Sequence, residues 1–105
     1  MITVSNEFLT ATFSEIGAEL KSLKCGGKEY IWNGDPAFWT GSAPVLFPIC
    51  SGLKDDEFIY NGKTYTMPKH GFARRTEFAV ESVKKDCVTF LLSSANVPKD
   101  NYPFE

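Results

Sequence analysis

One short segment, residues 67–75 with the sequence MPKHGFARR, holds the single histidine of the chain together with both of its arginines. The pKa of a histidine side chain is ordinarily about 6.5, so His70 could give or take a proton at neutral pH, or hydrogen-bond a ligand oxygen. Gly71 would let the backbone approach a ligand closely, because glycine carries no side chain. The pattern alone favours a simpler interpretation of His70, a loop histidine bonded to a carbonyl group.

The two adjacent arginines could add positive charge to this segment. In an extended chain neighbouring side chains point to opposite faces, so one of Arg74 and Arg75 would reach the loop and the other would face solvent. The pattern favours surface charge for Arg75. For Arg74 it favours surface charge and a role in the site equally. A guanidinium group is a planar fork of donors that suits carboxylates, phosphates or sugar hydroxyls.

Aromatic residues form a second candidate set. Most of them are expected in the core, because aromatic side chains bury large apolar areas. Trp39 is the exception, since it lies in a segment that does not alternate and its indole face could stack on a sugar ring. The acidic run at residues 54–57, KDDE, is expected to form a turn or carry solvated charge. The aromatic residues considered are Trp32, Phe38, Trp39, Phe47 and Phe72.

Composition and charge exclude several classes of function. The 105 residues carry a net charge of −2 with both signs interspersed, which offers no basic surface for a nucleic acid. The longest apolar run, residues 43–50, is too short to span a membrane and contains prolines. The N-terminal sequence MITVSNEFL lacks the pattern of a signal peptide.

The cysteines point to a reducing compartment. Cys25, Cys50 and Cys87 are widely spaced and no CxxC pair occurs, so neither a zinc site nor a disulfide framework is expected. We therefore expect a cytoplasmic protein. Cys50 lies in an apolar run beside Pro48 and is expected to be buried as a small hydrophobic residue.

The elements that must position these residues are predicted to be β-strands joined by tight turns. Gly26-Gly27 and Asn61-Gly62 favour hairpin turns, because these residues accept positive φ. Gly17 argues against a helix over residues 14–24. The segments that alternate like strands are ITVSN (2–6), FLTATFSEIG (8–17), AELKSLKC (18–25), KEYIW (28–32), EFIY (57–60), KTYTM (63–67), TEFAVESV (76–83) and CVTFLLSS (87–94).

Two segments do not alternate. Residues 35–56, DPAFWTGSAPVLFPICSGLKDD, are rich in proline, glycine and aromatic residues, and such long irregular segments are often functional. Residues 96–105, NVPKDNYPFE, contain two prolines and lead into no further strand, so the chain is predicted to stop partway through a fold. The unpaired strand edges of an unfinished sheet would favour pairing with a second copy.

Taken together, residues 42–78 resemble the early part of the aldose 1-epimerase (galactose mutarotase-like) family, in the branch with LacX-like and hexose-phosphate epimerase-like proteins. The matching features are the LFPI loop, the Y-NGK-Y hairpin and the motif HGFAR. The resemblance extends over nearly the whole chain but covers only the N-terminal part of the family's length. It implies that residues 1–105 are part of an all-β domain, an antiparallel β-sandwich that binds a sugar on one concave face.

The resemblance also implies an isomerase activity, the interconversion of the α and β anomers of a hexose or hexose phosphate. A base takes the proton of the C1 hydroxyl, an acid protonates the ring oxygen, and the opened ring closes on the other face. No metal or organic cofactor is implied. By match to the family's motif, His70 would polarise the sugar near its ring oxygen, and Lys69 and Arg74 would contact the substrate, although glutamine is commoner at the Lys69 position.

Two departures from the family pattern bear on activity. The family usually has Gly-Arg after the FPI loop, where this chain has Ser51-Gly52. The family's main acid, a second histidine, and its base, a glutamate, lie beyond the stretch that this chain matches, and Glu105 is not that glutamate. We therefore expect the chain alone to be nearly inactive. Two alternatives stay open: a non-catalytic carbohydrate-binding module of the same fold, and a structural β unit that pairs with another chain.

Overall fold

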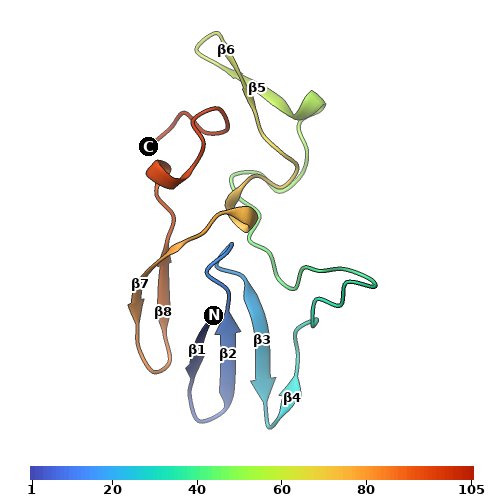
Figure 1. The fold of residues 1–105 in the computed structure, drawn as a ribbon, viewed down its shortest axis with the longest axis vertical. Helices are drawn as coiled ribbons and strands as arrows, with labels where there is room; N and C mark the ends of the chain where they lie inside the picture. The colour runs from blue at the N-terminus through green and yellow to red at the C-terminus, as the bar shows by residue number, and fades with distance from the viewer.

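The computed structural model describes residues 1–105 and consists of short antiparallel strands joined by turns and long loops (Figure 1). A four-stranded sheet lies at one end of the molecule, and the hairpin β7–β8 lies beside it. The hairpin β5–β6 lies at the opposite end, and the loops that connect the two ends cross in the middle. The prediction of an all-β, antiparallel and partial architecture is confirmed.

The four-stranded sheet follows the predicted alternation. Each strand pairs with the next along the chain, in the order β1-β2-β3-β4. The turn between β1 and β2 is closed by Asn6, whose side-chain oxygen accepts hydrogen bonds from the Phe8 and Leu9 amides at 2.8 Å. The strands are β1 (Ile2–Ser5), β2 (Leu9–Phe13), β3 (Leu20–Cys25) and β4 (Lys28–Glu29).

The prediction that residues 28–32 form one strand was wrong, because β4 ends at Glu29. The carboxylate of Glu29 accepts hydrogen bonds from the amides of Leu23, Tyr30 and Ile31, at 2.8, 3.1 and 3.0 Å. The Tyr30 amide also donates to the Leu23 carbonyl at 2.9 Å, but the Leu23 and Ile31 amides bind the Glu29 side chain, so the ladder does not continue beyond this point. The alternating pattern of residues 30–32 could not reveal this competition.

Both later hairpins are confirmed. Asn61 and Gly62 have φ values of 50° and 75°, as the predicted tight turn requires. The strands are β5 (Glu57–Tyr60), β6 (Lys63–Thr66), β7 (Ala79–Val83) and β8 (Val88–Leu91), and the single-turn 3-10 helices are η1 (Lys54–Asp56), η2 (Ala73–Arg75) and η3 (Ser94–Asn96). In η1 the exposed Asp55 and Asp56 have positive φ, which confirms the acidic run as a turn.

The hairpin β7–β8 is attached to the first sheet at several points. The Ser5 amide donates to the Lys85 carbonyl at 2.8 Å, and an antiparallel bridge joins Ile16 to Glu77. Irregular loops connect the remaining parts. No helix is long and apolar enough to cross a membrane.

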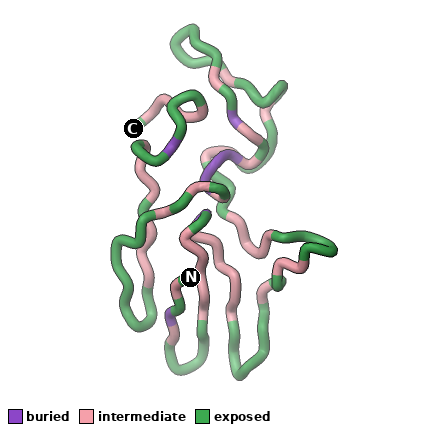
Figure 2. Tube along the Cα trace, viewed as in Figure 1, coloured by how far each residue is buried: buried purple, intermediate pink, exposed green.

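The core is small and lies where the loops cross. Only seven of the 105 residues are buried, and the buried cluster consists of Met67, Phe72 and Val97 (Figure 2). The prediction that most of the aromatic residues considered lie in the core was wrong, since Phe72 alone is buried. The exposed members of that set are Trp32, Phe38, Trp39 and Phe47. The physical reason is the lack of a second layer of strands over them, so their apolar area stays in solvent.

Candidate functional site

The histidine segment is held against the LFPIC loop by backbone hydrogen bonds. The Phe47 carbonyl accepts from the amides of Phe72 and Ala73, at 3.1 and 3.2 Å, and the Ser51 carbonyl accepts from the His70 amide at 2.9 Å. The two loops thus form one unit, although they are about twenty residues apart in the sequence. This unit fixes the backbone on both sides of His70.

Gly71 makes the close contact between the loops possible. Its φ is +72°, and a Cβ atom at this position would lie 2.1 Å from the Phe47 carbonyl oxygen. Such a contact excludes any side chain, and the positive φ independently disfavours one. The sequence prediction attributed Gly71 to ligand approach, whereas the structure shows that it brings two parts of the chain together.

The His70 side chain has one ring nitrogen engaged and one without a partner. Its Nδ1 atom lies 2.7 Å from the Cys50 carbonyl oxygen. A carbonyl oxygen only accepts, so we assign the proton to Nδ1, which leaves Nε2 as the acceptor in the neutral ring. The interpretation of His70 as a loop histidine bonded to a carbonyl is therefore confirmed. The same bond orients the ring for proton transfer or hydrogen bonding through Nε2.

The prediction that Cys50 is buried was wrong, because this residue is exposed. The neighbouring Ile49 packs against the buried cluster, whereas the carbonyl groups of Cys50 and Ser51 bond to the histidine segment and the Cys50 side chain stays exposed. The atom of Cys50 that contacts the His70 ring is its carbonyl oxygen, which the residue type does not reveal.

Arg74 turns back toward the histidine segment. It lies in η2, and its Nη2 atom donates to the Lys69 carbonyl at 3.1 Å, while its buried Nε atom has no hydrogen-bond partner. The Gly17 amide donates to the Thr76 carbonyl at 2.8 Å, which fixes the end of this turn. Arg75 is exposed, which confirms it as surface charge.

Lys69 lies beside the loop at Ser51-Gly52. A Cβ atom built at Gly52 would have the Lys69 Cγ atom, at 4.0 Å, as its only neighbour. The two ion pairs of the protein lie elsewhere, at the N-terminus with Glu15 and at Lys21 with Glu19. The charges of Lys69 and Arg74 are therefore not neutralised by a carboxylate, and an anion could bind them.

Trp39 is not brought to the histidine segment by any contact of this chain. Trp39 is 51% exposed, and its carbonyl accepts a hydrogen bond from the Trp32 Nε1 atom at 2.8 Å. The segment that follows β4 extends away from the middle of the molecule (Figure 1). Of the predicted site residues, the structure thus groups Lys69, His70 and Arg74 and leaves Trp39 apart.

A carboxylate that the sequence did not single out anchors the far end of the Trp39 segment. Glu19 accepts hydrogen bonds from the amides of Ser42 and Ala43, at 2.6 and 2.9 Å. Partial burial of Glu19 acts to raise its pKa, but the bonds from these amides and from Lys21 outweigh it, so this pKa lies below its ordinary value. No sequence signal links Glu19 to a segment more than twenty residues away.

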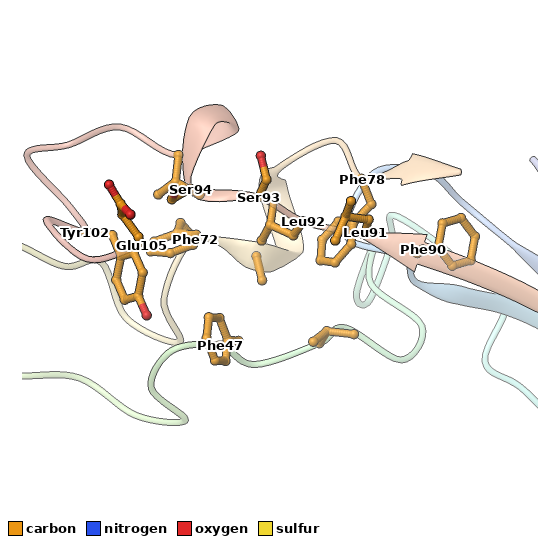
Figure 3. A pocket seen from close by; sticks show the side chains of 13 residues that line it. Phe47, Phe72, Phe78, Phe90, Leu91, Leu92, Ser93, Ser94, Tyr102 and Glu105 are labelled. Carbon is orange, nitrogen blue, oxygen red and sulfur yellow. The ribbon is translucent and has the colours of Figure 1, made fainter. Parts of the chain in front are cut away.

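An apolar groove with a volume of about 490 Å³ lies next to the two loops (Figure 3). It is lined by Val45 and Phe47 of the first loop, by Phe72, Ala73 and Phe78, by residues 90–94 and by Val97, Tyr102 and Glu105. His70, Lys69 and Arg74 do not line it. No cluster of three or more His, Cys, Asp or Glu side chains is placed to hold a metal ion.

Known proteins share both the sequence and the fold. The chain is 40% identical over 110 residues to the protein LacX of Lactococcus lactis subsp. lactis, covering 99% of this chain and 37% of LacX. The crystal structure of a galactose mutarotase related enzyme from Lactobacillus acidophilus superposes with a TM-score of 0.90 at 41% identity, over 98% of this chain and 35% of that one. A galactose mutarotase-like protein from Lactobacillus casei gives a TM-score of 0.88 at 38% identity, over 99% of this chain and 36% of that one.

The chain thus spans little more than a third of the length of the relatives that it matches. The family model named Aldose 1-epimerase matches residues 1–105, which is the whole chain. On the sequence, the fold and this match, the chain belongs to the aldose 1-epimerase family.

Proposed function

We propose that the His70 segment is part of a sugar site that interconverts the α and β anomers of a hexose or hexose phosphate. The observation that carries this proposal is the geometry of His70. Its Nδ1 atom is held by the Cys50 carbonyl at 2.7 Å, its Nε2 atom has no partner, and two cations without carboxylate partners lie in the same segment. Membership of the aldose 1-epimerase family supplies the reaction class.

His70 is suited to act on the ring oxygen of the sugar. In the protonated ring, Nε2–H can donate to that oxygen and stabilise the charge that develops as the ring opens. The Cys50 carbonyl accepts from Nδ1 in both protonation states, so the ring keeps its orientation when the proton moves. The C1 hydroxyl loses its proton to a base, C1 rotates, and the ring closes on the opposite face.

Lys69 and Arg74 are proposed to hold the oxygens of the substrate. The family pattern expects an arginine where this chain has Gly52, and the structure places the Lys69 stem beside that position. We therefore propose that Lys69 supplies the missing positive charge. The Arg74 guanidinium donates to the Lys69 carbonyl through Nη2 at 3.1 Å, which keeps its charge in the same segment. A phosphate group or the hydroxyls of a sugar would satisfy these donors.

Trp39 is proposed as a stacking surface for the same sugar. Trp39 is half exposed and carried on a projecting segment, so one face of its indole is free to pack on the C–H groups of a pyranose ring. We also place the protein in the cytoplasm, because its three cysteines are exposed and none is paired.

The chain alone is expected to bind sugar weakly and to turn it over hardly at all. His70 is its only histidine, and ring opening needs both an acid and a base. Anomer exchange of galactose and of glucose 6-phosphate, followed by NMR on the purified chain and on His70→Ala, tests this expectation. Exchange well above the buffer rate in the chain, lost in the variant, would show that the chain is a complete catalyst. Calorimetric titration with glucose 6-phosphate tests whether His70 belongs to the sugar site. Equal affinities of the unaltered chain and of His70→Ala would exclude His70 from that site.

A non-catalytic carbohydrate-binding module is the second candidate. The absence of an arginine at Ser51-Gly52 favours it, because an anchoring group of the family pattern is missing there. Sugar binding without anomer exchange, in a longer protein that contains this chain together with the rest of the domain, would establish this alternative. Anomer exchange in that protein would exclude it.

A further inference from the structure

A tight turn between β2 and β3, residues 15–19, lies against the end of the histidine segment. A Cβ atom at Gly17 would be 2.8 Å from the Arg74 carbonyl oxygen, so the two backbones are in direct contact. Ala18 has a φ of +47°, which is unusual for a residue other than glycine. Backbone conformations of this kind persist where the surrounding structure requires them, and they are common at functional sites. This conformation sets the direction of the next side chain, which is that of Glu19.

The Glu19 carboxylate connects this turn to the loop that begins at Ser42. Its Oε1 atom accepts hydrogen bonds from the Ser42 and Ala43 amides, at 2.6 and 2.9 Å, and its Oε2 atom accepts one from Lys21 Nζ at 3.2 Å. The Glu19 side chain is only 14% exposed. Hydrogen bonds to an ionised carboxylate are strong and directional, so these contacts hold the backbone of residues 42 and 43 in place.

Trp39 lies three residues before Ser42 and packs on the chain between them. A Cβ atom at Gly41 would be 2.5 Å from the Trp39 Cζ2 atom and 2.7 Å from its Cε2 atom, so the indole lies directly over Gly41. Gly41 leaves room for the ring because glycine has no side chain. The backbone that supports the indole is therefore adjacent to the residue that Glu19 holds.

We propose that Glu19 is a positioning residue of the sugar site, which fixes the backbone under the Trp39 indole and so orients this stacking surface. The inference rests on the proposed function, in which Trp39 packs on the sugar. The loop that Glu19 holds at its start continues to Cys50, whose carbonyl lies 2.7 Å from the His70 ring. The position of Trp39 relative to His70 therefore depends on both attachments of this loop.

The first test observes the indole directly. The chain has two tryptophans, so NMR shows two indole N–H signals, and Trp32→Phe identifies that of Trp39. Glu19→Ala should shift the Trp39 signal. Glu19→Gln should leave it in place, because an amide oxygen can accept both backbone bonds. The matched control is Glu15→Ala, which removes from the same turn a carboxylate that binds the N-terminal ammonium group, and it should not shift the signal.

Three results of this test would overturn the inference. The Trp39 signal could stay in place in Glu19→Ala, move equally in Glu15→Ala, or move equally in Glu19→Gln. If Glu19→Ala does not fold, Glu19→Asp replaces it. The aspartate keeps the charge but is one methylene group shorter, so it cannot reach both amides unless the loop moves. The same shift is expected in Glu19→Asp, and a signal that stays in place there would overturn the inference.

The second test relates the orientation of Trp39 to binding, by NMR titration with glucose 6-phosphate. Trp39→Ala should weaken binding by about two- to tenfold, the contribution of one aromatic contact. Glu19→Ala should weaken it by a similar factor. The double variant should bind no more weakly than Trp39→Ala, because both substitutions remove the same contact.

The binding results separate this inference from the proposed function. A loss of affinity in Trp39→Ala without a loss in Glu19→Ala would overturn the role of Glu19 alone. Losses that multiply in the double variant would overturn it too, since Glu19 would then act independently of the indole. Full affinity in Trp39→Ala would refute the proposed stacking of Trp39 on the sugar, and the role of Glu19 in it as well.

Discussion

Replacing Gly71 with alanine should disconnect the two loops that hold His70. The added Cβ atom would lie 2.1 Å from the Phe47 carbonyl oxygen, whereas contacts under 3.0 Å essentially never occur, so this carbonyl must retreat by almost 1 Å. That carbonyl accepts hydrogen bonds from the amides of Phe72 and Ala73, at 3.1 and 3.2 Å, and both bonds would be lost. The His70 ring would then lose its fixed position over the Cys50 carbonyl.

The expected loss of stability can be worked out from these contacts. A residue other than glycine at positive φ costs about 1–2 kcal/mol. Each lost backbone hydrogen bond costs about 0.5–1.5 kcal/mol. The free energy of unfolding should therefore fall by about 2–5 kcal/mol, which is a large part of the total for a domain with so small a core.

Gly62 provides a matched control for this substitution. Its φ of +75° is almost the same as that of Gly71, but no atom lies within 4 Å of an added Cβ. Gly62→Ala should therefore cost only the conformational strain, about 1–2 kcal/mol. Urea unfolding of both variants, followed by circular dichroism, measures the difference. Equal midpoints for the two variants would show that the contact between Gly71 and Phe47 does not hold the loops together.

Two further predictions concern Glu29 and the proposed substrate cations. Hydrogen bonds from Ser22, from the Leu23 and Ile31 amides and from Tyr30 lower the pKa of Glu29 to about 2, against partial desolvation. A lowered folded-state pKa stabilises the fold above the unfolded value, 4.5, and this contribution is lost as the pH falls toward 2. Glu29→Gln should therefore flatten the decline of the unfolding temperature between these two pH values, and an unchanged slope would contradict the assignment. Lys69→Gln should weaken the binding of glucose 6-phosphate by roughly tenfold, as expected for a lost charged contact. Adding Gly52→Arg to the Lys69→Gln variant should restore the affinity for glucose 6-phosphate, because the space beside Gly52 is open. Calorimetry that finds no restoration would refute the proposal that Lys69 replaces the positive charge of an arginine at position 52.

The sequence alone determined the elements whose signals are local. The Asn61-Gly62 turn and the alternating strands beside it need only neighbouring residues to specify φ and pairing. The grouping of Lys69, His70 and Arg74 was predictable for a similar reason, since they lie within one short segment and Arg74 bonds back to the Lys69 carbonyl.

Only the tertiary structure decided how these residues are oriented and which apolar residues are covered. The bond from His70 to the Cys50 carbonyl joins residues 20 positions apart, and the bond from Ser42 to Glu19 joins residues 23 positions apart. No local pattern records such contacts, because they depend on how the loops cross in space. Burial has the same origin, since the apolar side chains of Phe47 and Trp39 stay exposed where no second layer of this chain covers them.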